Sequence, residues 1–129
     1  MNGRYLLDTN IIIALFANDS AVVKGLDRAT EVFVPAVVLG ELYYGARKST
    51  QVEANLSKID KLASTAAVLG CDAVTAAQYG IVKNALREKG RPIPENDIWI
   101  AAIAKQHNLT LVSRDEHFRE VAEPAVEIW

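Results

Sequence analysis

The sequence contains a single cysteine, Cys71, so no disulfide can form within the chain, and a reducing, cytoplasmic setting fits. One cysteine and two histidines also disfavour a dedicated zinc site, which draws on several such ligands. No apolar run approaches the roughly 20 residues that cross a bilayer, and the opening MNGRYLLDTN does not have the pattern of a cleaved signal peptide. A glycine-rich phosphate-binding motif is absent as well. Cys71 follows an expected strand end, and we interpret it as buried packing and not as a nucleophile.

The composition is that of a folded globular protein. Half of the 129 residues are hydrophobic and 23% are charged, which suits one domain with a real core. We find no internal repeat, low-complexity tract or linker, so residues 1–129 are expected to form a single domain. The net charge of -2 does not by itself indicate a nucleic-acid-binding protein, which is more often basic.

Short apolar runs alternate with longer helical patterns along the chain. Strands are expected at residues 4–7, 31–35, 66–70, 109–112 and 125–129, and helices at roughly 10–17, 20–28, 36–48, 51–64, 73–89 and 96–107. Pro35 suits the first turn of the third helix. Gly90 suits a helix end, with Pro92 and Pro94 preventing continuation. The alternation predicts an α/β fold with a parallel sheet covered by helices.

Two aspartates follow expected strands. Asp8 comes directly after the first strand, and Asp115 comes three residues after the strand LTLV. Ligands of α/β sheets bind beyond the carboxyl ends of the strands, so both carboxylates lie at one edge if these strands are neighbours. Each has a plainer interpretation. Asp8 is a good cap for a helix starting near Asn10, and SRDE at residues 113–116 is a capping-box pattern before a short helix.

Two further carboxylates lie on helix faces that are otherwise apolar. In PAVVLGELYYGARK, Glu41 has apolar or small residues one turn before and after it, and in NDIWIAAIAKQH the same holds for the turn after Asp97. Both side chains therefore point where the core pattern points. The alternatives are that Asp97 caps its helix and that Glu41 sits in solvent at the edge of the stripe. A one-residue shift would put Glu95 or Asn96 in the role given to Asp97.

Four inward carboxylates from distant segments repel one another unless a cation holds them. Clusters of oxygen ligands suit Mg²⁺ or Mn²⁺. Such a site is a common device for cleaving phosphodiesters, because the metal lowers the pKa of a bound water and stabilises charge on the attacking and leaving oxygens. The residues by themselves thus predict a metal site that Asp8 faces.

The segments LLDTNIIIAL, PAVVLGELYYGARK and NDIWIAAIAKQHNLTLVSRDEHF, in this order and spacing, resemble the PIN-domain ribonucleases, and within them the VapC toxins of bacterial toxin–antitoxin pairs. The resemblance covers essentially the whole chain. It implies a PIN-like three-layer α/β/α sandwich with a central parallel sheet, in a single PIN domain. It implies Asp8, Glu41, Asp97 and Asp115 as the metal-binding and catalytic acids, with Thr9, Asn10, Asn96 and Ser113 in supporting polar roles.

The resemblance further implies an endoribonuclease toxin that uses Mg²⁺, with Mn²⁺ able to substitute, a cognate VapB-like antitoxin, and a homodimer. Apolar helix residues that could form a groove for the antitoxin are Ile12, Ile13, Phe16, Val52, Leu56 and Ile59. Two alternatives stay open. One is a nuclease that acts on DNA or structured flaps, and the other is a non-catalytic binding module with a vestigial metal site.

The four acids account for much of the negative charge, and the remainder of the chain carries a formal charge of +2 when they are set aside from the net charge of -2. The basic residues that could border the cleft and meet phosphates are Arg47, Lys48, Lys83, Arg87, Lys89, Arg91, Arg114 and Arg119. No aromatic stacking platform can be read from the sequence, so RNA recognition is expected through shape and exposed single strands. His117 is not expected to act as a general acid, because the metal does that work. Trp99 is expected in the core.

Overall fold

A computed structural model describes residues 3–129 of the protein. Parallel strands form one five-stranded sheet in the order β3-β2-β1-β4-β5. The strands are β1 (Arg4–Leu7), β2 (Glu31–Pro35), β3 (Ala67–Leu69), β4 (Thr110–Val112) and β5 (Val126–Glu127). All of them lie where the sequence predicts a strand. β4 is one residue shorter than predicted, and the two edge strands, β3 and β5, are shortened more, which fits the usual brevity of strands at the edge of a sheet.

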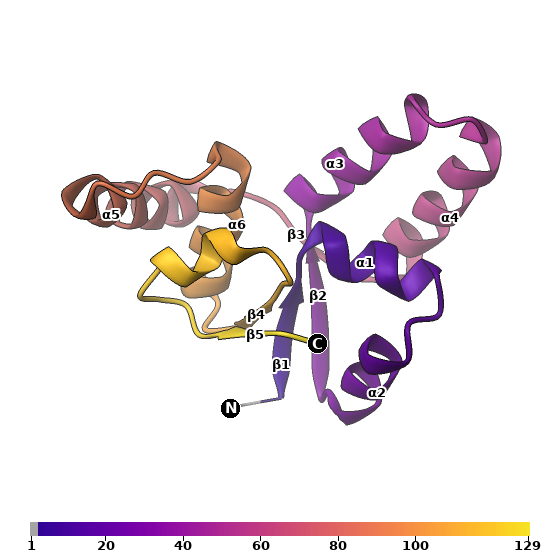
Figure 1. Cartoon of the computed structure of the whole chain (residues 1–129), viewed down its shortest axis with the longest axis horizontal. Coiled ribbons are helices and arrows are strands. Elements are labelled where there is room, and N and C mark those ends of the chain that lie inside the picture. The colour runs from indigo at the N-terminus through magenta and orange to yellow at the C-terminus, as the bar shows by residue number, and fades with distance from the viewer. Residues whose placement is uncertain (1–2) are drawn as a thin grey trace.

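Six α-helices and a short 3₁₀-helix, η1, are present within residues 3–129. Their bounds are α1 (Thr9–Phe16), α2 (Ser20–Arg28), α3 (Ala36–Arg47), α4 (Val52–Thr65), α5 (Ala73–Lys89), α6 (Glu95–Gln106) and η1 (Glu116–Glu120). Figure 1 shows α1 to α4 on one side of the sheet and α5, α6 and η1 on the other. Right-handed crossovers require this division, because the chain moves from β1 through β2 to β3 and then returns past β1 to β4 and β5. The predicted three-layer α/β/α sandwich is confirmed.

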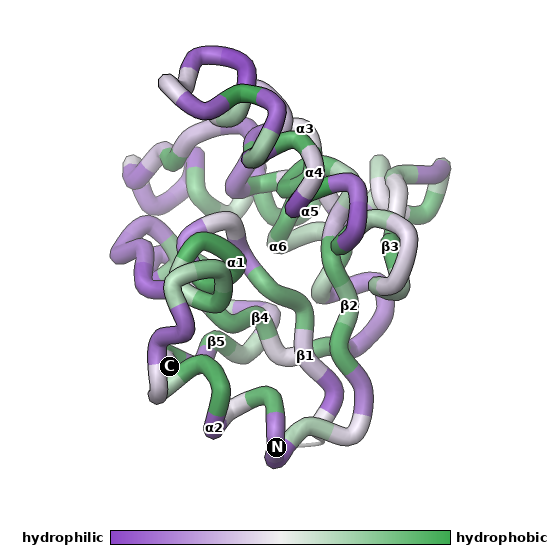
Figure 2. The backbone as a smooth tube through the Cα atoms, turned by 90° about the vertical axis from the view of Figure 1, so that its right-hand side faces the viewer, coloured by the Kyte–Doolittle hydropathy of each residue, from purple (hydrophilic) through white to green (hydrophobic). Residues whose placement is uncertain are grey.

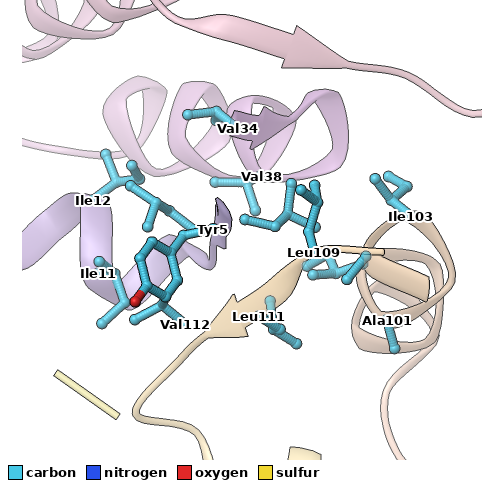
Figure 3. Packing of buried hydrophobic residues seen from close by; sticks show 14 of the residues in the cluster. Tyr5, Ile11, Ile12, Val34, Val38, Ala101, Ile103, Leu109, Leu111 and Val112 are labelled. Atoms are coloured by element: carbon cyan, nitrogen blue, oxygen red, sulfur yellow. The ribbon is translucent and has the colours of Figure 1, made fainter. Parts of the chain in front are cut away.

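The hydrophobic core is centred on β1, β4 and α6. Leu6 of β1 and Leu111 of β4 are fully buried, and α6 buries nearly every residue from Asp97 to Ala104. Figure 3 shows side chains of these elements meeting those of α1 and α3, such as Ile11 and Val38. Figure 2 shows the complementary pattern at the periphery, where the turn between α3 and α4 is largely hydrophilic. Strands covered on both faces are expected to be apolar on both, as these are.

Helix ends follow the predicted signals. Gly90 ends α5 in the left-handed conformation with φ of 67°, which glycine adopts without strain. Pro35 is the last residue of β2 and the N-cap of α3, one position before the first helical turn in which it was expected. No helix within residues 3–129 combines the length and the apolar character of a membrane span.

Two packing predictions need correction. Cys71 is exposed, not buried, because it lies in the connection between the edge strand β3 and α5, where no second layer covers it. Trp99, predicted to lie in the core, is only half-buried, and its ring stacks on Tyr79 of α5 with centroids 4.1 Å apart. The core tryptophan is instead Trp129, which packs edge-to-face on Tyr5 of β1 with centroids 5.0 Å apart.

Candidate metal centre

The carboxyl ends of β1 and β4 lie side by side in the middle of the sheet. Leu7 pairs with Val112, and the backbone N–H of Asp8 donates to the carbonyl of Val112 at 3.0 Å. The chain leaves β1 for the helices on one face of the sheet, whereas β4 is connected to the helices on the other face (Figure 1). This is the topological switch point of a doubly wound sheet, where such folds bind their ligands.

Asp8 is buried at this switch point, with 4% of its surface exposed. Its Oδ1 accepts a hydrogen bond from the backbone N–H of Thr9 at 2.8 Å, and its Oδ2 accepts one from Ser113 Oγ at 2.7 Å. Burial raises the pKa of Asp8 to about 6. The two hydrogen bonds oppose the rise, and the charges of Asp97 and Glu41 add to it. Asp8 caps α1 and also lies within the field of the other acids, so the two interpretations of its position are compatible.

Glu41 is linked to the start of α1 through Thr9. Thr9 Oγ1 donates to Glu41 Oε1 at 2.9 Å, which joins α1 to the middle of α3. The Glu41 residue is half-buried, between the buried and the solvent-exposed positions considered from the sequence. Its charge contributes to the raised pKa of Asp8, so it belongs to the same electrostatic cluster.

Asp97 points into the same region from the first turn of α6. It does not cap the helix, because Pro94 occupies the N-cap position. Only 8% of Asp97 is exposed. Burial raises the pKa of Asp97, the hydrogen bond with His117 opposes this rise, and the charge of Asp115 adds to it. A buried carboxylate in the first turn of a core helix is costly without a positive partner.

Glu95 and Asn96, the neighbours that a small shift would substitute for Asp97, are both exposed. Glu95 forms an ion pair with Lys83 (Nζ to Oε1, 2.7 Å) and accepts a hydrogen bond from Tyr79 Oη at 2.8 Å. Asn96, predicted to have a supporting role, lies outside the hydrogen bonds that join the acids. The structure therefore places Asp97, and not Glu95, with the other carboxylates.

His117 bridges Asp97 and Asp115. Its Nδ1 lies 2.8 Å from Asp97 Oδ2 and 3.0 Å from Asp115 Oδ1, and the three ligand atoms lie within 4.8 Å of one another. Asp115 also caps η1, accepting a hydrogen bond from the backbone N–H of His117 at 2.9 Å. The capping role predicted for Asp115 is thus present together with the clustering. Sequence reasoning did not place His117 in the cluster, and its only signal was its position two residues beyond Asp115.

Ser113 joins the acids that follow β1 and β4. Besides donating to Asp8, its Oγ accepts hydrogen bonds from the backbone N–H of Asp115 at 3.0 Å and from Asn10 Nδ2 at 3.4 Å. Asn10 Oδ1 in turn accepts from the backbone N–H of Arg114 at 3.1 Å. These bonds fix the start of α1 against the segment after β4, so the carboxylates are held in place before any ligand arrives.

The donor set fits a divalent cation. The hydrogen-bond partners of the four carboxylates are backbone N–H groups, hydroxyls and one imidazole. They leave the negative charge of two buried aspartates largely uncompensated, and burial raises the pKa of both, Asp8 and Asp97. Carboxylate oxygens are the ligands that hard divalent cations prefer, and a cation at this edge would supply the missing charge.

A groove of about 340 Å³ lies beside Glu41, between α1, α3 and α4. Its lining includes Ile13, which is 56% exposed, together with Phe16 and Ile59. These three are among the residues predicted to form an antitoxin groove. Ile12 was predicted there as well, and that prediction is wrong, because Ile12 faces the core and is fully buried.

Two of the basic residues expected to border the cleft, Arg114 and Lys48, interact with other residues of the protein. Arg114, next to Ser113, forms an ion pair with Asp19 (3.1 Å), and its Nε donates to the carbonyl of Trp129 at 2.7 Å. Lys48 lies over the ring of Tyr44, 4.8 Å from its centroid, and Tyr44 is 67% exposed. Tyr44, one turn after Glu41, therefore does not belong to the apolar core face expected from the sequence, and its exposed ring is available for stacking.

The fold and the site together define a class, the α/β proteins with a cluster of acidic residues at the switch point of a doubly wound sheet. The profile of the PIN domain matches residues 5–124. The chain belongs to the PIN-domain family, as the resemblance of its motifs implied.

Relatives match this chain over almost its whole length. The ribonuclease VapC2 of Haemophilus influenzae is 35% identical over 129 residues, which cover 98% of each chain. The tRNA(fMet)-specific endonuclease VapC of Shigella flexneri is 33% identical, again with 98% of each chain covered. Among solved structures, VapBC2 from Rickettsia felis, bound to a DNA fragment from the promoter, superposes with a TM-score of 0.88 at 31% identity, covering 97% of this chain and 98% of the other.

Proposed function

We propose that this chain, residues 1–129, is a single PIN domain that acts in the cytoplasm as the endoribonuclease toxin of a VapBC-type toxin–antitoxin pair. The observation that carries the proposal is the gathering of Asp8, Asp97 and Asp115, with Glu41 tied to them through Thr9, at the switch point of the sheet. The whole-length similarity to VapC ribonucleases supports the same function.

The metal requirement follows from the charge of the site. Asp97, Asp115 and Asp8 are the proposed ligands, and the ion is Mg²⁺, with Mn²⁺ able to substitute. When bound, the ion lowers the pKa of a water and neutralises charge on the phosphodiester. Asp8 is kept in place by Ser113 Oγ and by the N-terminus of α1, whose positive end favours the ionised carboxylate.

The chain's own residues favour direct attack of water on the RNA phosphorus, without a covalent intermediate. The hydroxyl nearest the acids, Ser113 Oγ, donates its proton to Asp8, and Thr9 Oγ1 donates to Glu41. Both hydroxyls therefore serve to position carboxylates. Glu41, half-buried at the rim of the groove, is placed to orient the water or the phosphate and to take up a proton at its carboxylate.

The substrate is RNA, and a tRNA is the first one to test. The Shigella flexneri relative is named for cleavage of tRNA(fMet), and the exposed ring of Tyr44 with Lys48 beside it offers a surface for an unpaired base near Glu41. The initiator tRNA is therefore the first substrate to compare with other tRNAs.

The groove between α1, α3 and α4 is the proposed seat of the antitoxin. Its apolar lining suits a helix or extended segment, and its end at Glu41 would let a basic side chain of the antitoxin neutralise the acids. The protein is also proposed to form a homodimer. Exposed apolar residues on α5, Val74 at 55% and Ile81 at 53%, support an association of this kind, and light scattering at micromolar concentration tests it.

The test of the function is cleavage of RNA and DNA by the purified chain, with Mg²⁺ and with EDTA. Asp97→Asn should lower RNA cleavage at least about 100-fold, more than the loss of a typical outer partner of a metal. Glu95→Gln is the matched control, because Glu95 is exposed and paired with Lys83, and it should keep wild-type activity. Cleavage of DNA in preference to RNA would favour the flap-type nuclease, and no cleavage of either would favour a binding module.

A further inference from the structure

The imidazole of His117 occupies an unexplained position within the acidic cluster. An all-carboxylate site needs no histidine, yet Nδ1 of His117 is directed between Asp97 Oδ2 and Asp115 Oδ1, at 2.8 and 3.0 Å. The two oxygens and the nitrogen form the group within residues 3–129 whose ligand atoms lie close enough to share one ion. His117 therefore belongs, with Asp97 and Asp115, to the three residues whose ligand atoms lie close enough for one ion.

The spacing of the three atoms fits coordination of a single cation. Adjacent ligands of an octahedral ion with bonds of about 2.0–2.1 Å lie about 2.9 Å apart. The two distances from Nδ1 to the carboxylate oxygens, 2.8 and 3.0 Å, bracket that value. Without the ion, the same nitrogen shares a hydrogen bond with the carboxylates. With the ion, the lone pair of Nδ1 can take the place of that contact while the ring keeps its position.

The backbone around His117 holds the ring in this place. Its N–H donates to Asp115 Oδ1 at 2.9 Å, which fixes the start of η1. The next residue, Phe118, is 1% exposed and anchors the same turn in the core. The backbone that carries the ring is thus fixed on both sides, so less freedom is lost when His117 becomes a ligand, and preorganised ligands bind metals more tightly.

We propose that His117 is a nitrogen ligand, through Nδ1, of the ion held by Asp97 and Asp115, and that it raises the affinity of the site for Mn²⁺ and other transition metals relative to Mg²⁺. Imidazole nitrogen suits transition metals, whereas Mg²⁺ favours oxygen ligands. The inference rests on the proposed metal-dependent function and adds a residue that sets metal preference. His117 acts on the choice of ion and not on the reacting atoms.

Pulsed EPR of Mn²⁺ added to the full chain tests this directly, because a directly bound imidazole nitrogen modulates the electron spin echo. The wild-type protein should show this ¹⁴N coupling, and His117→Asn should lose it, since Asn offers an oxygen at similar size. His107→Asn is the matched control. It removes the only other histidine of the chain, at the end of α6, and should keep the coupling.

The same samples give the metal preference, with Mn²⁺ binding measured by EPR and Mg²⁺ binding by competition. His117→Asn should lower the ratio of Mn²⁺ to Mg²⁺ affinity at least about tenfold, the lower end of the cost of losing a partner of a metal site. His117→Gln serves as a second variant if the Asn protein is not folded by circular dichroism.

The outcomes separate this inference from the proposed function. If Mn²⁺ binds to the wild type in a manner that depends on Asp97, yet shows no ¹⁴N coupling, His117 is not a ligand and the nuclease proposal stands. An unchanged affinity ratio in His117→Asn overturns the inference in the same way. If neither ion binds to the wild type at millimolar concentration, both the inference and the metal-dependent function fail.

Discussion

Ser113 Oγ donates a 2.7 Å hydrogen bond to Asp8 Oδ2, although the two residues are 105 positions apart in the chain. The bond joins the ends of β1 and β4, so it exists only when the sheet has assembled with these strands as neighbours. It holds a buried carboxylate in one orientation. The geometry of the candidate metal centre is thus a consequence of the strand order, because Ser113, after β4, fixes the orientation of Asp8, after β1.

Ser113→Ala should therefore weaken metal binding and RNA cleavage about 10–100-fold, as loss of a residue that orients a ligand usually does. The variant should also be about 1–3 kcal/mol less stable, because Asp8 loses a buried donor. Calorimetric titration with Mn²⁺ and a cleavage assay provide the measurement. Ser64→Ala, at an exposed hydroxyl that bonds only to its own helix, should change neither. Equal metal affinity in the two variants would show that Asp8 needs no orientation by Ser113.

The ion-free protein should lose stability as the pH rises from about 4 to 7. The pKa of Asp8 is about 6 in the folded protein against an ordinary value of 3.8, so between these values the folded state holds a proton that the unfolded state has released. The pKa of Asp97 shifts upward as well. The contribution of His117, whose pKa is also raised by its bond to Asp97, is present at low pH and is lost as pH rises through its folded pKa.

Urea unfolding in EDTA at pH 5 and pH 7.5 measures this slope. The raised pKa of Asp8 costs on the order of 3 kcal/mol in total, at about 1.4 kcal/mol for each unit, and roughly half of this develops between pH 5 and pH 7.5. Asp8→Asn should remove most of the slope and keep the helix cap, because Asn caps as well as Asp. Asp27→Asn, at an exposed carboxylate on α2, should leave the slope unchanged. A wild-type protein that is more stable at pH 7.5 than at pH 5 would contradict the prediction.

Asp97→Asn should raise the melting temperature in EDTA and abolish the gain from a divalent ion. The substitution removes a buried charge that nothing but a cation and His117 compensates. The wild type should gain roughly 2.7 kcal/mol at a hundred times the dissociation constant of the ion, since the ion binds the folded state only. Thermal melts of both proteins, in EDTA and in excess Mn²⁺, provide the measurement. Identical melts of the two proteins in both buffers would exclude a shared metal site.

A charge at Ile13 should break the antitoxin complex and spare the nuclease. Ile13 lines the groove and is 56% exposed, so Ile13→Glu costs little core packing. Affinity for the product of the neighbouring antitoxin gene should fall at least about tenfold, or 1.4 kcal/mol, while RNA cleavage by the free chain stays the same. Ile128→Glu, at a similarly exposed isoleucine near the end of the chain and outside the groove, is the control. Undiminished binding by Ile13→Glu would place the antitoxin elsewhere.

The sequence predicts the fold and the clustering of the acids because both depend on local patterns. Strands covered by helices on both faces appear in the sequence as short apolar runs, as at residues 4–7 and 31–35. The helix α6 is recognisable as a core helix because most of its residues are apolar. Asp97 stands out because it interrupts that pattern. A carboxylate on a core face has few explanations, and the fold provides one by bringing α6 to the ends of β1 and β4.

The features that the sequence does not predict depend on contacts with residues that are distant in the chain. His117 is exposed on a short 3₁₀-helix, where periodicity carries no information, and its partner Asp97 is 20 residues away. Cys71 is exposed because it follows the edge strand β3. The order of the strands, which decides that β3 lies at an edge, cannot be predicted from the residues around Cys71. Trp129 is buried only because α2 offers a surface without a side chain at Gly25.

The contact between Gly25 and Trp129 leads to a prediction about stability and the site together. A Cβ atom added at Gly25 would lie 2.4 Å from Cδ2 of Trp129, far inside van der Waals contact with the indole ring. Gly25→Ala must therefore displace the ring from Tyr5, and it should destabilise the protein by about 1–3 kcal/mol, as overpacking of a core does. Gly80→Ala on α5 is the control, since no atom lies within 4 Å of its added Cβ. It should instead be neutral or stabilising by up to about 1 kcal/mol, because alanine favours the helix.

The displacement should also reach the metal centre, because the carbonyl of Trp129 accepts a 2.7 Å hydrogen bond from Arg114 Nε. The backbone N–H of Arg114 donates to Asn10, which contacts Ser113. We expect Gly25→Ala to lower RNA cleavage several-fold at a temperature where the protein is still folded, and Gly80→Ala to leave it unchanged. The double variant Gly25→Ala, Trp129→Leu should lose less stability than the sum of the two single changes, because the smaller side chain leaves room for the new methyl group. Strict additivity of the two changes would show that the ring and the added methyl group do not meet, and that α2 moves aside instead.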